Sequence, residues 1–139
     1  MPSETKTPRK RRAPLSRERV MTAAVGLADE AGEVPSMRVL AKKLGVEAMS
    51  LYNYVSNKVD LIDGMIDIVW EEVGTLDPDA HWIDAMRDRA HKIREVLRLH
   101  PWAIGLMEGR HNPGPANLQH HHDVLGCLRR GGLYPAAVA

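Results

Sequence analysis

One short segment of the chain carries polar and apolar side chains that suit contacts with nucleic acid. Tyr52 has a hydroxyl that can donate to a phosphate, and Ser50 and Asn53 can hydrogen-bond to a phosphate or a base edge. Ala48 and Met49 can touch a thymine methyl group. The residue types therefore predict binding to a polyanion in this segment.

Lys58 stands where a helix is expected to begin, directly after the N-cap candidate Asn57. A helix N-terminus offers free N–H groups and a partial positive charge, so a lysine there is slightly unfavourable without an anionic partner. Beside DNA the same lysine would hold a phosphate. The alternative is a solvated lysine, with Tyr52 and Tyr54 packed on the core of a small domain.

Two helices are expected before this segment. Residues 17–31 place apolar side chains on one helical face between the N-cap Ser16 and the C-terminal Gly32. A shorter helix is expected between the N-cap Ser36 and Gly45. Both have the signals that normally begin and end a helix.

Two more helices follow a tight turn. One is expected from Ala48 to about Val55, and the next from its cap Asn57 to Val73, with Asp60 as a capping-box-like partner. Two short helices joined by a tight turn and supported by a longer helix form a helix-turn-helix arrangement, whose second member enters a major groove.

The remaining sequence predicts three further helices and no strand. They are expected over residues 81–99, 102–107 and 116–130, with the start of another at Tyr134. The predicted fold class is therefore all-α. We expect a disordered basic arm over residues 1–15, a DNA-binding domain over 16–74 that includes the connecting helix, and a partial helical ligand-binding and dimerisation domain over 75–139.

The charge of the 139-residue chain is uneven. The net charge is +1, yet residues 1–58 hold eleven Lys and Arg against six Asp and Glu, and residues 59–139 hold eight against twelve. This asymmetry favours a polyanion partner for the first part only. An uneven surface without functional meaning is the alternative. The basic arm, with Arg9 to Arg12, would add salt-dependent DNA contacts or act only as a solubilising tail.

Cysteine content and hydropathy restrict the compartment. Cys127 is the single cysteine, so an intrachain disulfide is excluded. No apolar run approaches the roughly 20 residues of a membrane span, and no secretory signal follows the basic N-terminus. We expect a cytoplasmic protein without a membrane partner.

Residues 16–74 resemble the DNA-binding domain of the tetracycline-repressor (TetR) family, most strongly across 36-SMRVLAKKLGVEAMSLYNYVSNKVDLID-63. The shared features are the Leu-Gly-Val turn, a Leu-Tyr pair at the centre of the recognition helix, and Val-x-Asn-Lys before helix four. The resemblance implies a repressor that binds a palindromic operator as a homodimer and is released by a small-molecule effector.

The resemblance also implies which side chains contact DNA. Arg38 and Ser50 would lie nearest the bases, with Tyr52 and Lys58 on phosphates. Tetracycline repressors carry Gln-Pro at the positions of Ala48-Met49 and His at the position of Tyr54, so a different operator is expected. The predicted DNA-binding set is Arg38, Ala48, Met49, Ser50, Tyr52, Asn53, Tyr54 and Lys58.

Residues 75–139 resemble the ligand-binding region of the family more weakly. In that family ligand binding shifts helix four and spreads the two DNA-reading heads of the dimer. Trp and Met side chains suit the wall of an apolar pocket, although each could equally be ordinary core packing. The predicted pocket residues are Trp82, Met86, Arg89, Ile93, Trp102, Leu106, Met107 and His111.

The run from His120 to His122 invites a metal interpretation. Neighbouring residues on a helix point about 100° apart, so the three rings cannot converge on one ion. One of them could join His111 or Glu108 in a metal site, but solvated or pocket-lining histidines are the preferred interpretation. We therefore predict no metal and no cofactor.

Two alternatives to the regulator stay open. One is a small all-α enzyme or metal-binding module that uses the histidines, although no nucleophile, acid and base appear at a telling spacing. The other is a constitutive DNA binder without a ligand. Family members usually continue into two long helices that pair between subunits, so the chain is expected to be truncated or to form a different dimer.

Overall fold

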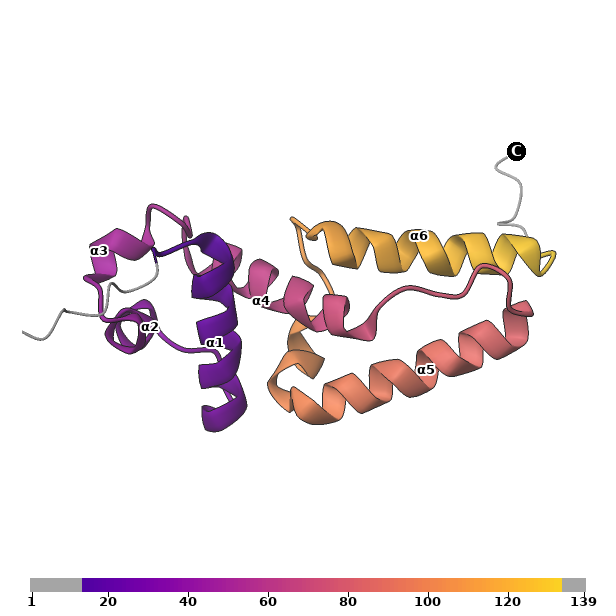
Figure 1. Cartoon of the computed structure of the whole chain (residues 1–139), viewed down its shortest axis with the longest axis horizontal. Helices are drawn as coiled ribbons and strands as arrows, with labels where there is room; N and C mark the ends of the chain where they lie inside the picture. The colour runs from indigo at the N-terminus through magenta and orange to yellow at the C-terminus, as the bar shows by residue number, and fades with distance from the viewer. Residues whose placement is uncertain (1–13, 134–139) are drawn as a thin grey trace, which may run out of the picture.

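Helices build both ends of the molecule in the computed structural model, which describes residues 14–133 (Figure 1). Helices α1 (Arg17–Ala31), α2 (Met37–Leu44) and α3 (Ala48–Leu51) form one end. Helix α4 (Lys58–Val73) leads from this end into the other. The described part contains no strand, and the predicted all-α fold is confirmed.

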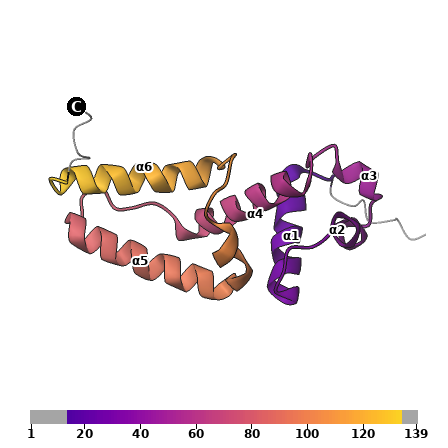
Figure 2. The same cartoon turned by 180° about the vertical axis from the view of Figure 1, so that it is seen from behind.

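The second end contains two long antiparallel helices and a short turn between them. Helix α5 (Trp82–Leu99), the 3-10 helix η1 (Pro101–Leu106) and helix α6 (Pro115–Arg130) follow α4 in the chain. Both views show α5 and α6 extending away from α1–α3, with the end of α4 entering between them (Figure 2). No helix within residues 14–133 is long and apolar enough to cross a membrane.

The predicted helix caps are present. Side-chain oxygens of Ser16, Ser36 and Asn57 accept hydrogen bonds from backbone N–H groups three residues further on, over 3.2, 3.2 and 2.9 Å. Gly32 and Gly45 end α1 and α2 with φ of 79° and 68°, a conformation that side chains with a Cβ disfavour. Local sequence signals therefore define where these helices begin and end.

Several expected boundaries differ from the structure. Helix α3 ends at Leu51 instead of about Val55, because the backbone then makes tight i→i+3 bonds, such as Tyr54 N–H to the Leu51 carbonyl over 2.9 Å. The short helix expected from Trp102 is a 3-10 helix that starts at Pro101. His81, expected as the first residue of the helix over 81–99, lies just before α5.

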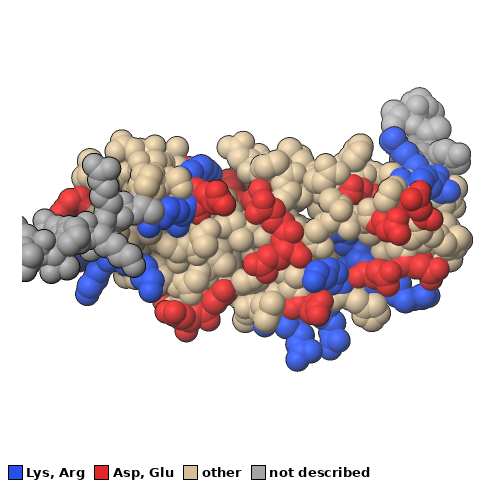
Figure 3. Space-filling view, viewed as in Figure 1, with Lys and Arg blue, Asp and Glu red and all other residues tan. Residues whose placement is uncertain are grey.

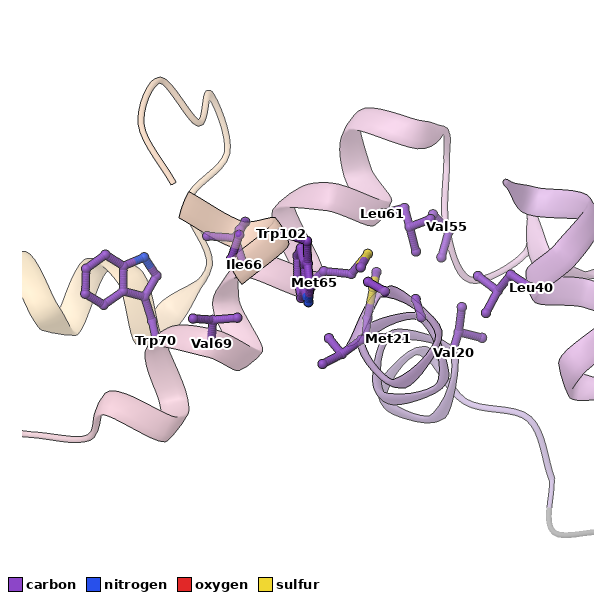
Figure 4. Close-up of a cluster of buried hydrophobic side chains, with 14 of the residues drawn as sticks. Val20, Met21, Leu40, Val55, Leu61, Met65, Ile66, Val69, Trp70 and Trp102 are labelled. Carbon is purple, nitrogen blue, oxygen red and sulfur yellow. The ribbon is translucent and has the colours of Figure 1, made fainter. Parts of the chain in front are cut away.

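One continuous hydrophobic core joins the two ends (Figure 4). At the α1–α3 end, Leu40 and Leu61 are fully buried beside Val55. Further along α4, Met65 belongs to the same core as Trp102 of η1. Helix α4 therefore packs against the helices of both ends. A displacement of this helix would change the packing at both ends of the molecule.

Parts of the expected arm and C-terminal helix lie outside the described residues. The basic arm was expected over residues 1–15, of which the structure describes Pro14 and Leu15. The helix expected from Tyr134 lies wholly outside. Leu15 packs against the core in front of α1.

Candidate nucleic-acid interface and ligand cavity

The α2–α3 unit exposes several of the side chains that the sequence assigned to DNA. Met49 is 77% exposed and Tyr52 is 48% exposed, and Arg38, Asn53 and Lys58 are exposed as well. Ala48, Ser50 and Tyr54 are partly buried. Five of the eight predicted residues are thus exposed.

The turn between α2 and α3 is fixed by backbone bonds and by packing. After Gly45, the Val46 N–H donates to the Ala41 carbonyl over 3.1 Å. Leu40 of α2 and Leu51 of α3 are both fully buried in the shared core. The exposed face of α3 is therefore held at a fixed angle to α2, as base reading requires.

Tyr52 and Tyr54 occupy different environments. Tyr54 packs against the core, and its carbonyl accepts a hydrogen bond from Arg17 Nη1 over 2.9 Å. Tyr52, on the outside of the same turn, keeps its ring half exposed. The alternative in which both rings pack on the core therefore describes Tyr54 but not Tyr52.

An ion pair connects the start of α1 to the start of α4. The Arg17 guanidinium donates to both carboxylate oxygens of Asp60, over 2.8 and 2.9 Å, and Asp60 also accepts from the Ser56 N–H over 2.9 Å. The hydrogen bond from Arg17 is the main reason that the pKa of Asp60 is lowered. This contact positions the chain between Leu51 and Lys58.

Charge is distributed unevenly over the surface (Figure 3). Asp and Glu side chains form a band across the middle of this face, and Lys and Arg side chains appear both at the end formed by α1–α3 and at the end formed by α5 and α6. Two cations on α2, Lys42 and Lys43, are exposed in the last turn before Gly45. These two cations would attract a polyanion to the α2–α3 unit.

A cavity of about 530 Å³ lies in the second end, next to α4. Its size is within the range of small-molecule sites. Trp70 of α4, Ile93 of α5, Ile104 of η1 and His120 of α6 line it. Met107 and Arg110, from the loop between η1 and α6, contribute as well.

Two of the eight predicted pocket residues, Ile93 and Met107, line this cavity. Arg89 is buried elsewhere and donates to the Gly74 carbonyl over 2.6 Å. Trp102 is buried in the core, where its Nε1 donates to Asp29 Oδ1 over 2.7 Å. These two side chains hold helices together.

The other four predicted pocket residues also lie outside the cavity. Leu106 packs against the hydrophobic core, and Trp82 packs against Gly131. Met86 is partly buried on α5, and His111 is exposed. Sequence reasoning missed Trp70, Arg110 and Asn117, and treated His120 only as part of the histidine run. The available signal was the three-residue spacing of Asn117 and His120, which puts both on one face of α6.

His120 is part of the cavity wall and is uncharged near neutral pH. Its ring stacks on Trp70 with 3.9 Å between centroids and 21° between planes. Burial, assisted by the positive charge of Arg89, lowers the pKa of His120 to about 4. His121 and His122 are exposed, and no three His, Cys, Asp or Glu side chains in the described part are placed to share a metal ion.

A buried histidine links the two ends of the molecule. His100 Nδ1 is 2.6 Å from Asp29 Oδ1 on α1, and its Nε2 is 2.7 Å from Glu72 Oε2 on α4. Burial opposes the charged imidazolium, but the bonds to the two carboxylates outweigh it and raise the pKa of His100. The imidazolium thus joins α1, α4 and the α5–η1 junction.

Comparison with known proteins gives one consistent result. Residues 75–139 match the family described as "Tetracyclin repressor-like, C-terminal domain". The chain is 37% identical over 123 residues to the HTH-type transcriptional repressor DrrR1 of Streptomyces coeruleorubidus, covering 86% of this chain and 45% of that protein. It is 36% identical over 126 residues to an HTH-type transcriptional regulator of Saccharopolyspora erythraea, covering 89% and 53%. The chain therefore spans about half the length of the curated relatives it matches.

Solved structures agree with the fold. The TetR family protein ActR of Streptomyces coelicolor, in complex with (S)-DNPA, has a TM-score of 0.78 and 30% identity, covering 88% of this chain and 62% of that chain. ActR in complex with actinorhodin gives 0.77 and 31%, covering 88% and 59%. BioQ with its double-stranded DNA operator gives 0.75 at 23% identity, covering 87% and 74%, and supports the fold alone.

Proposed function

Because the chain belongs to the TetR family of transcriptional regulators, we propose that it is a repressor that binds a palindromic operator as a homodimer and leaves it when a small molecule binds. The proposal assigns operator reading to residues 16–74 and effector binding to residues 75–139. It assigns no catalytic residue, and it places the protein in the cytoplasm with the DNA it would control.

The observation that carries this proposal is the rigidly supported, exposed face of the α2–α3 unit. Met49 and Tyr52 project from a short segment whose backbone is held by the core on one side and by the Arg17–Asp60 ion pair on the other. An exposed methionine and a half-exposed tyrosine next to basic residues fit a DNA interface better than they fit a free surface.

Within this interface the roles follow the expected docking of a helix-turn-helix. Arg38 and Ser50 are proposed to approach the bases, together with Ala48, Met49 and Asn53. Tyr52 and Lys58 are proposed to contact phosphates on either side of the groove. Tyr54 is the weakest member of the set, since its ring packs against the core.

Effector binding is proposed to act through α4. Trp70 of this helix forms part of the cavity wall, and Leu61 of the same helix is fully buried with Leu40 and Leu51 in the core of the α1–α3 end. A ligand that displaces Trp70 would move α4, and with it the spacing of two recognition helices in a dimer. Such coupling needs no flexible segment between the two ends.

The test is fluorescence anisotropy with DNA from upstream of the gene itself and with a scrambled control, at low and at physiological salt. We expect sequence-dependent binding that persists at physiological salt, with a stoichiometry of two chains per palindrome. Binding that is equally weak for both DNAs and disappears with salt would show only the nonspecific phosphate attraction of a basic protein, and would contradict the proposal.

A further inference from the structure

Several residues that line the cavity next to α4 carry buried polar atoms without a hydrogen-bond partner in the described part of the chain. They are Trp70 Nε1, Arg110 Nε, Arg110 Nη1, Asn117 Oδ1 and His120 Nδ1. Leaving one buried polar atom without a partner costs about 1–3 kcal/mol. All of them belong to residues that line one cavity, and each atom is closed off from solvent, so a bound molecule would become their partner once the lining side chains turn toward it.

Arg110 is the cation among these residues, and it is only loosely held. Its Nη1 lies 3.5 Å from Asp63 Oδ1 on α4, and neither of these two atoms makes a hydrogen bond. The Arg110 side chain is 19% exposed and that of Asp63 is 7% exposed. A guanidinium binds a carboxylate best through two parallel N–H···O bonds, which this long contact does not provide.

Arg110 provides the main charge at the cavity wall, because the neighbouring titratable groups are neutral or exposed to solvent. His120 is neutral near neutral pH, since its pKa is about 4. Glu108 lines the cavity but is exposed, so solvent screens its charge. The polar side of the cavity therefore favours an anion, with Asp63 as the competitor for Arg110.

The remaining wall suits a flat ring system. Trp70 and His120 form a near-parallel stack, and Ile93, Ile104 and Met107 supply apolar and adaptable surface. The volume of about 530 Å³ fits a ligand of two or more fused rings.

We propose that this cavity binds a planar aromatic carboxylate, whose carboxylate takes Arg110 away from Asp63; the inference rests on the proposed effector role of the cavity. Binding would leave Asp63 buried without its cation. Because an unpaired buried carboxylate is costly, α4 would shift to expose it to solvent. Asp63 lies one helical turn after Asp60, which binds Arg17 of α1, so this shift starts beside the DNA-reading end.

The test is isothermal titration calorimetry of the full chain with 2-naphthoate and with 2-naphthamide, which share a ring and nearly the same shape but differ in charge. We expect naphthoate to bind about tenfold more tightly than the amide. Arg110→Gln should remove this preference. Arg87→Gln, which changes an exposed arginine on α5 paired with Asp84, should retain it.

A second variant tests the competition. Asp63→Asn should strengthen naphthoate binding several-fold, because Arg110 loses its internal partner. If Arg110→Gln fails to fold, Arg110→Lys keeps the positive charge but not the planar fork, and should reduce the preference for naphthoate.

Three results would overturn the inference: equal affinity for both probes, a preference that survives both Arg110 variants, or no binding of either probe. Weaker naphthoate binding by Asp63→Asn would overturn the competition. None of these results affects sequence-specific binding to upstream DNA, which the anisotropy experiment measures separately. Failure of that DNA binding would instead contradict the proposed function.

Discussion

Single side chains near the α3–α4 junction decide how the protein would hold DNA. Tyr52 and Lys58 are exposed on either side of a turn in which Tyr54 and Val55 face the core. These two exposed side chains would offer a hydroxyl group and a positive charge to phosphates. Neither of them packs into the hydrophobic core. Their removal should therefore affect binding without affecting folding.

Tyr52→Ala and Lys58→Ala are each expected to weaken DNA binding across all sequences, with helix content unchanged. Loss of one lysine–phosphate contact should reduce the slope of log affinity against log salt by about 1 in Lys58→Ala. Anisotropy titrations over a salt series and circular dichroism provide the measurements. Lys92→Ala, on an exposed position of α5, is the control. An unchanged affinity in either α3–α4 variant would refute this placement of the recognition helix.

At the scale of elements, glycines in different positions have opposite effects on the helices. Gly45 ends α2 with φ of 68°, a left-handed conformation that is strained for any residue with a Cβ. Gly26 lies inside α1 and is exposed, and a methyl group added there would meet no atom of another element within 4 Å. The turn therefore requires Gly45, whereas Gly26 only makes helix α1 less stable than a residue with higher helix propensity would.

Gly45→Ala is expected to lower the free energy of unfolding by about 1–2 kcal/mol, because alanine must adopt the left-handed conformation. Gly26→Ala is expected to raise it by about 0.5–1 kcal/mol, because alanine restricts the unfolded chain and favours the helix. Urea unfolding followed by circular dichroism measures both. Equal effects of the two changes would argue against the left-handed turn between α2 and α3.

For the whole molecule, the contacts of His100 matter most, because this residue joins the two ends. Its ring nitrogens contact Asp29 of α1 and Glu72 of α4, and Trp102 donates to the same carboxylate of Asp29. The bridge and the continuous core through α4 make the two ends mechanically connected. The strength of the His100 contacts to Asp29 and Glu72 depends on the positive charge of the His100 ring.

Stability is expected to fall as the pH rises through the folded-state pKa of His100. This pKa is raised above the ordinary value of 6.5, so the stabilisation is fully present below that value and is lost at higher pH. Thermal unfolding between pH 6 and pH 9 should show a decrease in Tm that is reduced in His100→Gln. His91→Gln, an exposed histidine on α5, should behave like the unchanged protein. An identical pH dependence in His100→Gln would exclude this bridge as the cause.

The sequence by itself determined most of the helices and the helix-turn-helix arrangement, because their signals are local. Ser16, Ser36 and Asn57 cap helices through atoms only three residues away, and Gly45 defines a turn through its own backbone. The shorter α3 was missed because its backbone changes to i→i+3 bonds around Leu51, and the Tyr54 carbonyl there also accepts a hydrogen bond from the distant Arg17. Five of the eight candidate DNA contacts are exposed, whereas Ala48, Ser50 and Tyr54 are partly buried, and the roles of all eight are predictions.

Only the tertiary structure decided the cavity and the bridge between the ends. Trp70, Arg110 and His120 come from α4, a loop and α6, and nothing in their sequence spacing brings them together. Trp102 and Arg89 resembled pocket residues by type, yet packing gave them partners in Asp29 and the Gly74 carbonyl. Burial and charge pairing depend on which helix faces meet, and that is set by the packing of the whole chain.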